Sequence, residues 1–600
     1  MEQLQEILNQ IDGWVWSPVL VALLFGTGLY LTLGLRFMPL YRLPAAIGLM
    51  FARTKDEDKS EGEISPVAAL FTALSATIGT GNIAGVATAI TIGGPGAVFW
   101  MWMTAVFGMA TKYAEAALAV TYREVDKRGV HVGGPMYYIK NGLGKRWIWL
   151  AFAFAIFTAI AAPGTGNLVQ ANSVAALVDS NLNLSAIGLP ETFTLFDSAE
   201  PLRTTKYVVG VVLALLVMMV ILGGVRSIAR VASVLVPFMA LAYVAGAVWV
   251  LSANASDVPT AFASIFTQAF SGTAAVGGFF GAAFAAAIRE GANRGSFSNE
   301  AGLGSAAIAH ASAQTRNPHR QGSIAMLGTF IDTLVVCTLT ALVILTAAGS
   351  FTYNPARAAL GQCWEQGRLA ESEIPGGLSY EALQIGAPQT DLTPADRAAD
   401  VAERGNAVRG ALEICQANGF AVPDIAFAAA TDHTVVAETE RVWASGIASA
   451  ADVTAQAFGA SIPGGQWIVT FGMMVFAFTT ILGWALYGER AMEFIFGVWV
   501  ITPYRIFWGI VVFTGAVWTN DLAWTAASIG NGMMAAPNLI ALLALSGTVF
   551  AIAKRHGARP GDEGDHKIHE HATPMPAPSA SGEADGGEDG GEAPEGEPDR

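Results

Sequence analysis

Two glycine-rich clusters interrupt long apolar stretches of this sequence, and each could bind a small charged solute. Residues 79–82 read GTGN within the apolar stretch 65–92, and residues 277–281 read GGFFG within 261–288. Glycine interrupts a helix and leaves backbone amides and carbonyls without helical partners. Freed N–H groups attract anions, whereas freed C=O groups attract cations. A zwitterionic solute would satisfy both sides of one break.

Polar side chains in the first cluster favour a binding site over simple helix packing. Glycines alone are typical of closely packed membrane helices, but Thr80 and Asn82 also need polar partners inside the protein. We expect the amides of Thr80 and Gly81 to bind a carboxylate. We expect carbonyls between Ser75 and Ile78 to bind an ammonium group or a cation.

Four further polar or aromatic positions are candidates for the same site. Residues 164–167 repeat the sequence GTGN, and Gln170 follows on roughly the same helix face. Gln170 contacts either the substrate or a neighbouring helix. Thr479 and Thr480 offer hydroxyl oxygens suited to a hard cation, unless they bond back to their own helix. Trp484, one turn after Thr480, would restrict the substrate to a small side chain or belong to the core.

A charged residue inside an apolar stretch is a functional candidate by default. Asp332 lies about ten residues into the stretch 322–349, where it would bind or relay a cation, or bond to neighbouring helices. Asn299 and Glu300 follow the second interrupted stretch. We interpret them as contacts of an inner gate, with an ordinary structured loop as the alternative.

Composition places the chain among membrane proteins. Hydrophobic residues make up 53% and charged residues 14%, with a mean hydropathy of +0.46, whereas soluble domains carry about 25% charged residues. Eleven stretches approach the ~20 residues that cross a bilayer. We therefore predict an all-α polytopic protein with these spans: 14–36, 65–92, 95–121, 147–178, 205–223, 231–252, 261–288, 322–349, 465–488, 499–518 and 525–553.

Lys and Arg gather in alternate loops, such as those around Arg36, Lys127, Arg226 and Arg490. The positive-inside rule puts these loops in the cytoplasm. We therefore expect a multi-pass protein of the bacterial plasma (inner) membrane, with the N-terminus outside and the C-terminus cytoplasmic.

The spans divide into two sets of five if the first is set aside. Each set opens with a glycine-interrupted stretch, and an odd number makes the sets run in opposite directions, which is typical of transporters with inverted repeats. We predict these segments: an extra N-terminal helix and inner loop at 1–64, the first repeat at 65–260, the start of the second at 261–349, an extracytoplasmic acidic insertion at 350–461, the rest of the second repeat at 462–556, and a disordered acidic cytoplasmic tail at 557–600.

The three cysteines suggest at most one disulfide. Cys363 and Cys415 both fall in the outer insertion, where oxidation is allowed, so they pair or remain free. Cys337 lies in an apolar stretch, as expected of a core residue. No Cys/His spacing resembles a zinc site, so we expect neither a transition metal nor a cofactor.

Three longer motifs resemble the alanine/glycine:cation symporter family. They are SATIGTGNIAGVATA at 75–89, continuing through GGPGAVFWMW at 93–102 and GMATKYAE at 108–115; RGSFSNEAGLGS at 294–305; and FIDT at 330–333. The resemblance covers roughly residues 14–350 and 440–550. The insertion at 350–461 is expected to be longer than is usual in the family.

The resemblance implies a LeuT-type fold of five plus five helices with one extra N-terminal helix. It implies inward transport of alanine or glycine with sodium, or with a proton. Substrate contacts would come from these residues: Thr80, Gly81, Asn82, Gln170, Gly278, Phe279, Thr480 and Trp484. A sodium site would use the carbonyls of Ser75 and Ile78 with Thr479 and Thr480.

Other functions remain as alternatives to a symporter of small neutral amino acids. A channel would expose a continuous pore, whereas two interrupted helices in one chain favour a closed site. No catalytic Ser/His pair, metal-binding motif or phosphate loop supports an enzyme. A sensor that binds an amino acid without transport, or a symporter of another small zwitterion, would have the same sequence features.

Overall fold

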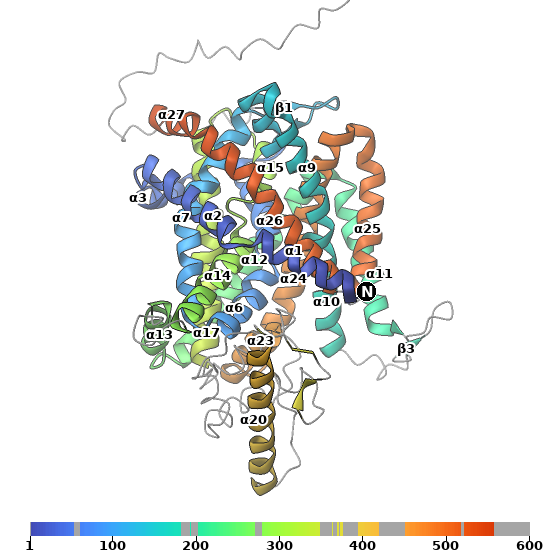
Figure 1. Cartoon of the computed structure of the whole chain (residues 1–600). Helices are drawn as coiled ribbons and strands as arrows, with labels where there is room; N and C mark the ends of the chain where they lie inside the picture. The colour runs from blue at the N-terminus through green and yellow to red at the C-terminus, as the bar shows by residue number, and fades with distance from the viewer. Residues whose placement is uncertain are drawn as a thin grey trace, which may run out of the picture. The chain divides into compact units, whose positions relative to one another are not determined.

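The computed structural model describes residues 2–52, 61–181, 192–193, 202–270, 279–347, 363, 369–370, 373–375, 394–418, 450–517 and 521–556. One compact unit comprises Met1–Ala553, and a second comprises Lys554–Arg600. Only the end of α27 is described in the second unit, so the expected disordered tail lies outside the described residues. The described chain is almost entirely helical, which confirms the all-α class (Figure 1).

The first half of the chain contains the expected extra helix and the first set of spans. Its elements are α1 (Glu2–Val15), α2 (Pro18–Gly34), α3 (Met38–Tyr41), α4 (Leu43–Phe51), α5 (Pro66–Thr77), η2 (Gly81–Gly85), α6 (Val86–Gly93), α7 (Gly96–Thr121), β1 (Glu124–Val125), β2 (His131–Val132), α8 (Pro135–Tyr138), η3 (Ile139–Leu143), η4 (Lys145–Trp147), α9 (Ile148–Pro163), η5 (Gly164–Leu168), α10 (Val169–Asn181), β3 (Thr192–Phe193), β4 (Leu202–Arg203), α11 (Thr204–Ile221) and α12 (Gly224–Ala253). Each strand pair forms a short antiparallel hairpin.

The second half contains the other set of spans and part of the insertion. Its elements are α13 (Val258–Phe270), α14 (Phe279–Asn299), α15 (Ser305–Ala311), α16 (Pro318–Thr329), η7 (Phe330–Cys337), α17 (Thr338–Ala347), α20 (Pro394–Ala417), α23 (Ala450–Ser461), α24 (Gln466–Phe496), η10 (Val498–Val500), α25 (Ile501–Val517), α26 (Asp521–Ala544) and α27 (Ser546–His556).

Nine of the eleven expected spans correspond to helices that are long and apolar enough to cross a membrane. Seven are single spans and two are bent pairs, all among the described residues. The two remaining regions contain α7, a helix of 26 residues, and the segment from α13 to α14. The last expected span is bent by 58° between α26 and α27, which the sequence did not suggest.

The first glycine cluster breaks its helix as predicted. Ser65 caps α5 by accepting a hydrogen bond from the Ala68 amide, and Pro66 occupies the first turn, where its missing N–H costs nothing. Ile78 then adopts an extended conformation with ψ of 102°, so α5 ends there. The chain resumes as a π-helical turn at η2, and the two halves meet at 59°.

The second glycine cluster is only partly described. Residues 271–278 fall outside the described chain, and Gly278 is among them, while Phe279 is the first residue of α14. Helix α14 continues to Asn299, so Asn299 is helical and does not belong to the loop that follows. The loop itself begins at Glu300, a non-glycine residue with φ of 55°.

The insertion joins the bundle at its end. Cys363 and Cys415 form a disulfide that ties its first part to α20. Helix α23 lies entirely within the expected insertion but packs against α24, α17 and η2, so this end of the insertion belongs to the helical bundle. Figure 1 shows α20 and α23 at one end of the molecule, opposite the hairpin that contains β1.

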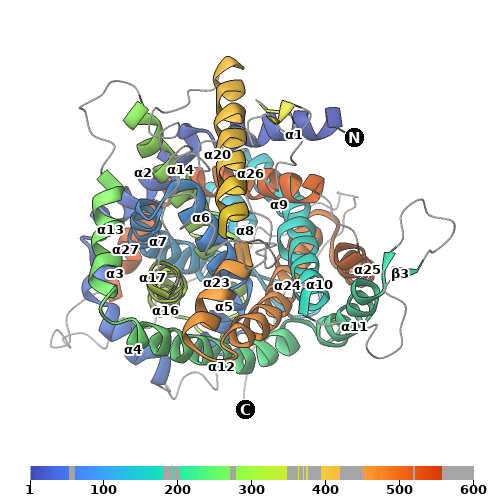
Figure 2. The same cartoon turned by 90° about the horizontal axis from the view of Figure 1, so that it is seen from below.

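Helices α5 and α24 lie inside the bundle and approach each other closely. Seen from the end with the insertion, α5, α23 and α24 lie inside an outer set that includes α11, α12 and α13 (Figure 2). A methyl group added at Gly483 of α24 would lie 2.7 Å from the Ala76 Cβ and 2.9 Å from its backbone nitrogen. Glycine at this position therefore lets α24 approach the broken helix.

Candidate functional site

The Asn82 side chain stabilises the break between α5 and η2. In a continuous helix the Gly79 amide would donate to the Ser75 carbonyl; here it donates to Asn82 Oδ1 at 3.0 Å. The Asn82 amide donates to the Gly79 carbonyl at 3.3 Å instead of to that of Ile78. The carbonyls of Ser75 and Ile78 therefore lose their helical partners, as the sequence analysis required of a cation site.

Two side chains from other helices flank Gly79 in this break. Thr480 of α24 donates its hydroxyl to the Ile78 carbonyl at 3.3 Å. Gln170 of α10 donates its amide to Thr80 Oγ1 at 3.2 Å. A methyl group added at Gly79 would lie 2.7 Å from Thr480 Oγ1 and 3.4 Å from Gln170 Oε1. The structure thus brings these predicted residues together.

Within the described part of the chain, Gln170 Oε1 is buried without a hydrogen-bond partner, next to the broken helix. An unpaired buried carbonyl of this kind costs about 1–3 kcal/mol. An ammonium group or another donor bound in the break would remove that cost. Gln170 therefore offers both a donor, already bonded to Thr80, and a free acceptor.

Trp484 is placed on the Gln170 side of the site. A methyl group added at Gly166, in η5, would lie 2.0 Å from the Trp484 Cβ. The indole is 1% exposed and its ring packs edge-on against Tyr487. Its proximity to η5 agrees with a wall next to Gln170, while a direct contact with substrate stays a prediction.

Two of the four expected sodium ligands make local hydrogen bonds. Thr479 donates its hydroxyl to the Phe476 carbonyl at 2.9 Å, and Ser75 donates to the Thr72 carbonyl at 2.7 Å. The Thr479 bond is the alternative that the sequence left open. Each hydroxyl still has lone pairs, and the Ser75 contribution was expected from its carbonyl.

Asp332 lies at the centre of a buried polar cluster directly behind the break. Asn82 Nδ2 donates to Asp332 Oδ1 at 2.7 Å and also lies 3.0 Å from Ser298 Oγ. Ser298 and Thr333 both donate to Asp332 Oδ2, the latter at 2.8 Å. The sequence did not single out Ser298, although it lies inside a quoted family motif.

The two predicted gate residues have different surroundings. Asn299 belongs to the Asp332 cluster, because its side-chain amide donates to Thr333 Oγ1 at 3.1 Å. Glu300 bonds to Ser305 within its own turn, which fits the alternative of a structured loop. Both side chains are buried.

Contacts of the second GTGN cluster complete the surroundings of the site, and one of its partners, Asn531, was not predicted from the sequence. Asn531 of α26 donates to Thr165 Oγ1 at 2.9 Å, and Asn167 donates to the Trp508 carbonyl at 3.0 Å. Their helices meet only in the tertiary structure. An Asn in the middle of an apolar helix is a weak signal, because it equally serves helix packing.

Three π-helical turns surround the candidate site: η2, η5 and η7. They contain Asn82, Asn167 and Asp332 respectively. A π-helical turn widens the helix and is frequent at functional sites. Two of these turns coincide with the repeated GTGN sequences, whereas nothing in the sequence marked the turn around Asp332.

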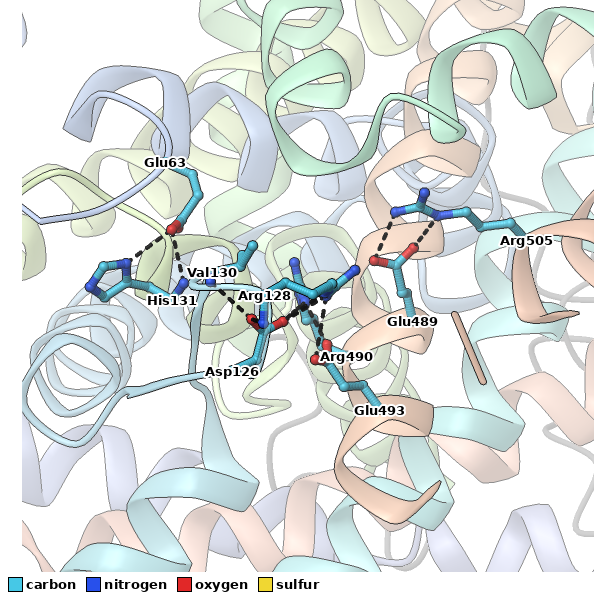
Figure 3. A network of polar contacts seen from close by, with 9 residues as sticks. All are labelled: Glu63, Asp126, Arg128, Val130, His131, Glu489, Arg490, Glu493 and Arg505. Atoms are coloured by element: carbon cyan, nitrogen blue, oxygen red, sulfur yellow. Dashed lines mark hydrogen bonds and ion pairs between the residues drawn. The ribbon is translucent and has the colours of Figure 1, made fainter. Parts of the chain in front are cut away.

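A second polar network lies at the end of the bundle that contains the β1–β2 hairpin (Figure 3). Its members are three acids and three arginines: Asp126, Glu489, Glu493, Arg128, Arg490 and Arg505. Arg128 lies 2.7 Å from Asp126 and 3.4 Å from Glu493. Arg505 makes two bonds to Glu489, at 2.6 and 3.1 Å. We call these six residues the ion-pair network.

The sequence profile of the sodium:alanine symporter family matches residues 1–367 and 395–570. The match covers most of the insertion, and residues 368–394 and 571–600 lie outside it. That the insertion is longer than is usual in the family stays a prediction.

Known proteins resemble the chain over nearly its whole length. The sodium/alanine symporter AgcS of Methanococcus maripaludis is 41% identical over 550 residues, which cover 91% of this chain and 96% of AgcS. An uncharacterized transporter of Haemophilus influenzae is 39% identical over 558 residues, or 93% and 97% of the two chains.

Among solved structures, the crystal structure of MhsT in complex with L-phenylalanine covers 82% of this chain and 99% of MhsT, with 13% identity and a TM-score of 0.34. The profile match and the 41% identity decide the assignment. The chain therefore belongs to the sodium:alanine symporter family, and it is a sodium-coupled amino-acid transporter, not an enzyme.

Proposed function

We propose that this protein imports a small neutral amino acid, alanine or glycine, together with sodium by alternating access. The observation that carries this proposal is the broken helix α5–η2, where the carbonyls of Ser75 and Ile78 lose their helical partners beside Gln170 Oε1, which has no hydrogen-bond partner among the described residues. A zwitterionic amino acid carries the two charges that the two sides of a helix break attract.

The substrate carboxylate would bind the amides of Thr80 and Gly81, close to Asn82. Its ammonium group would face Gln170 Oε1 and the freed carbonyls. Trp484 would limit the space for the side chain, which favours alanine and glycine over larger amino acids. The proposal also assigns contacts to Gly278 and Phe279 from the resemblance alone.

Sodium would bind on the other side of the same break. Its ligands would be the carbonyls of Ser75 and Ile78 and the hydroxyls of Thr479 and Thr480. The existing contact between Thr480 and the Ile78 carbonyl supports this assignment, because it joins α24 to the break. Cation and amino acid then share one break, so that each favours binding of the other.

The orientation follows from the distribution of basic residues. We propose that the protein lies in the bacterial plasma membrane, with the ion-pair network at its cytoplasmic end and the insertion outside. The amino acid would then enter from the side of the insertion.

Uptake of labelled alanine into liposomes that contain the purified protein tests the proposal. We expect accumulation above equilibrium with an inward sodium gradient, and none when potassium replaces sodium. Competition with unlabelled glycine, serine and leucine would define the size limit. If neither a sodium nor a proton gradient drives uptake of alanine or glycine, the proposed substrate is wrong.

A further inference from the structure

Among the residues that the structure describes, the Asp332 carboxylate receives hydrogen bonds only from neutral groups. Asn82 donates to one oxygen, and Ser298 and Thr333 donate to the other. Three donors of this kind stabilise an ionised carboxylate. The residue is completely buried in a span, where an isolated charge is costly unless a counter-ion accompanies it.

No fixed cation pairs with Asp332 among the residues that the structure describes. The Lys112 ammonium group interacts electrostatically with Asp332, but it also interacts with Glu115 and Glu300. Its Nζ makes no hydrogen bond to any described residue. One ammonium group thus faces three buried carboxylates. Cys337, the remaining titratable neighbour, lies 3.2 Å from Ser298 Oγ and carries no positive charge as a thiol or thiolate.

The cluster has the oxygen atoms that a small cation requires. Asp332 Oδ2 lies 2.8 Å from Thr333 Oγ1, which lies 3.4 Å from Ser298 Oγ. Hydroxyl and carboxylate oxygens are the ligands that hard cations prefer. Rotation of the two hydroxyl hydrogens would turn their lone pairs toward a cation bound at the carboxylate.

The cluster joins elements from both halves of the protein. Asn82 belongs to η2, directly after the first break. Ser298 is the penultimate residue of α14, the helix that follows the second glycine cluster. Asp332 belongs to η7. Asn82 also holds the Gly79 amide. A cation at Asp332 would therefore change the charge felt by the same side chain that stabilises the break.

We infer that Asp332, Ser298 and Thr333 form a second site for a transported monovalent cation, separate from the proposed site at Thr480. Sodium and the proton share the chemistry that this site recognises. The inference rests on the proposed symport, because the second cation would be transported with the amino acid. Asn82 connects the two sites without itself being a ligand.

The test compares Asp332→Asn with the unchanged protein in liposomes. Asn keeps the size and a hydrogen-bonding oxygen but removes the charge. Labelled alanine, radioactive sodium and internal pH are followed together. If the cation is sodium, the number of sodium ions per alanine falls by one in the variant. If it is a proton, acidification per alanine is lost while the sodium ratio stays constant. Unchanged ratios of both cations would overturn the inference.

Ser298→Ala keeps the charge and removes one ligand, so it decides the question if Asp332→Asn is inactive or does not fold. We expect the cation concentration for half-maximal uptake to rise severalfold, with sodium varied at fixed pH and pH varied at fixed sodium. The matched control is Thr346→Val, in the span that contains Asp332. It removes a buried hydroxyl that donates to the Leu342 carbonyl of its own helix. Equal cation dependence in Ser298→Ala and the control would contradict the inference.

A third measurement does not depend on alanine transport. Cation binding to the folded protein raises its unfolding temperature. Without any amino acid, we expect replacement of choline by sodium, or a change from pH 8 to pH 6 in choline, to raise this temperature more in the unchanged protein than in Asp332→Asn. If alanine uptake fails but this difference persists, only the proposed substrate is wrong. If the two proteins respond equally, the second site is absent.

Discussion

The ion-pair network and the Asp332 cluster use buried charge in opposite ways. In the ion-pair network, three acids face three arginines, and each arginine lies within 3.4 Å of an acid. In the cluster, one carboxylate faces only amide and hydroxyl donors. The arginines neutralise the acids of the ion-pair network. Among the described residues, no positively charged side chain pairs with Asp332.

This difference separates a structural task from a transport task. A balanced network has no use for a mobile ion, and it holds the β1–β2 hairpin against the end of α24. An ionised carboxylate inside a membrane span is costly without a counter-charge, and a transported cation at the proposed second site would supply it. The position of α24 links the two regions, because the same helix carries Thr480 at the break and Arg490 in the network.

The largest effect on stability is expected from Arg490→Ala. Its side chain is 4% exposed and bonds to Glu493 at 2.5 Å, so truncation removes the nearer arginine of the buried Glu493 carboxylate and leaves it Arg128 at 3.4 Å. Breaking such a pair costs about 3–5 kcal/mol. Thermal unfolding of the purified protein measures the loss. Arg409→Ala, which removes an exposed pair with Glu413, is the matched control and should change little. Equal unfolding temperatures would refute the structural role.

Asn82→Ala should give the largest loss of transport. The change leaves the Gly79 amide without its side-chain acceptor and Asp332 Oδ1 without its Asn82 donor, at about 1–3 kcal/mol apiece. We expect alanine uptake to fall about 10- to 100-fold, while unfolding changes less than in Arg490→Ala. Initial rates in liposomes, corrected for the amount of folded protein, provide the measurement. A variant with normal uptake would show that the break does not need this side chain.

Thr480→Ala should have a smaller effect, confined to sodium. The change removes the hydroxyl that contacts the Ile78 carbonyl. We expect the sodium concentration for half-maximal uptake to rise about tenfold, with a similar maximal rate at saturating sodium. Thr470→Val, whose hydroxyl bonds only to the Gln466 carbonyl of the same helix, is the matched control. A loss of maximal rate with unchanged sodium dependence would instead implicate the substrate.

The smallest effect is expected from acid acting on Asp126, in the hairpin outside the spans. Burial alone would raise its pKa, but hydrogen bonds from the Val130 amide and from Arg128 outweigh this and lower the pKa below its usual value. Its contribution to stability is therefore present above the unfolded pKa of about 4 and is lost as pH falls through the folded pKa. Unfolding temperatures between pH 3 and 6 should decrease less steeply in Asp126→Asn. Parallel curves would exclude this contribution.

Much of the candidate site was predictable because its polar residues interrupt apolar stretches. Thr80, Asn82 and Gln170 stood out against a background that bilayer burial keeps apolar, and the structure joins them. The structure also contains the disulfide between Cys363 and Cys415. The partners of Asp332 were not predictable, because Ser298 and Asn82 are far away in sequence and serine is common in any helix.

The sequence alone determined that the chain spans a membrane and that a helix breaks at the first glycine cluster, because both follow from local composition. Hydrocarbon excludes unpaired backbone groups and scattered charges, so apolar length and glycine clusters are read directly along the chain. Only the tertiary structure decided which charges are balanced. Arg490 lies next to Asp126, and Asp332 next to Asn82 and not next to a lysine, because of the way the helices pack together. Local composition does not determine that packing.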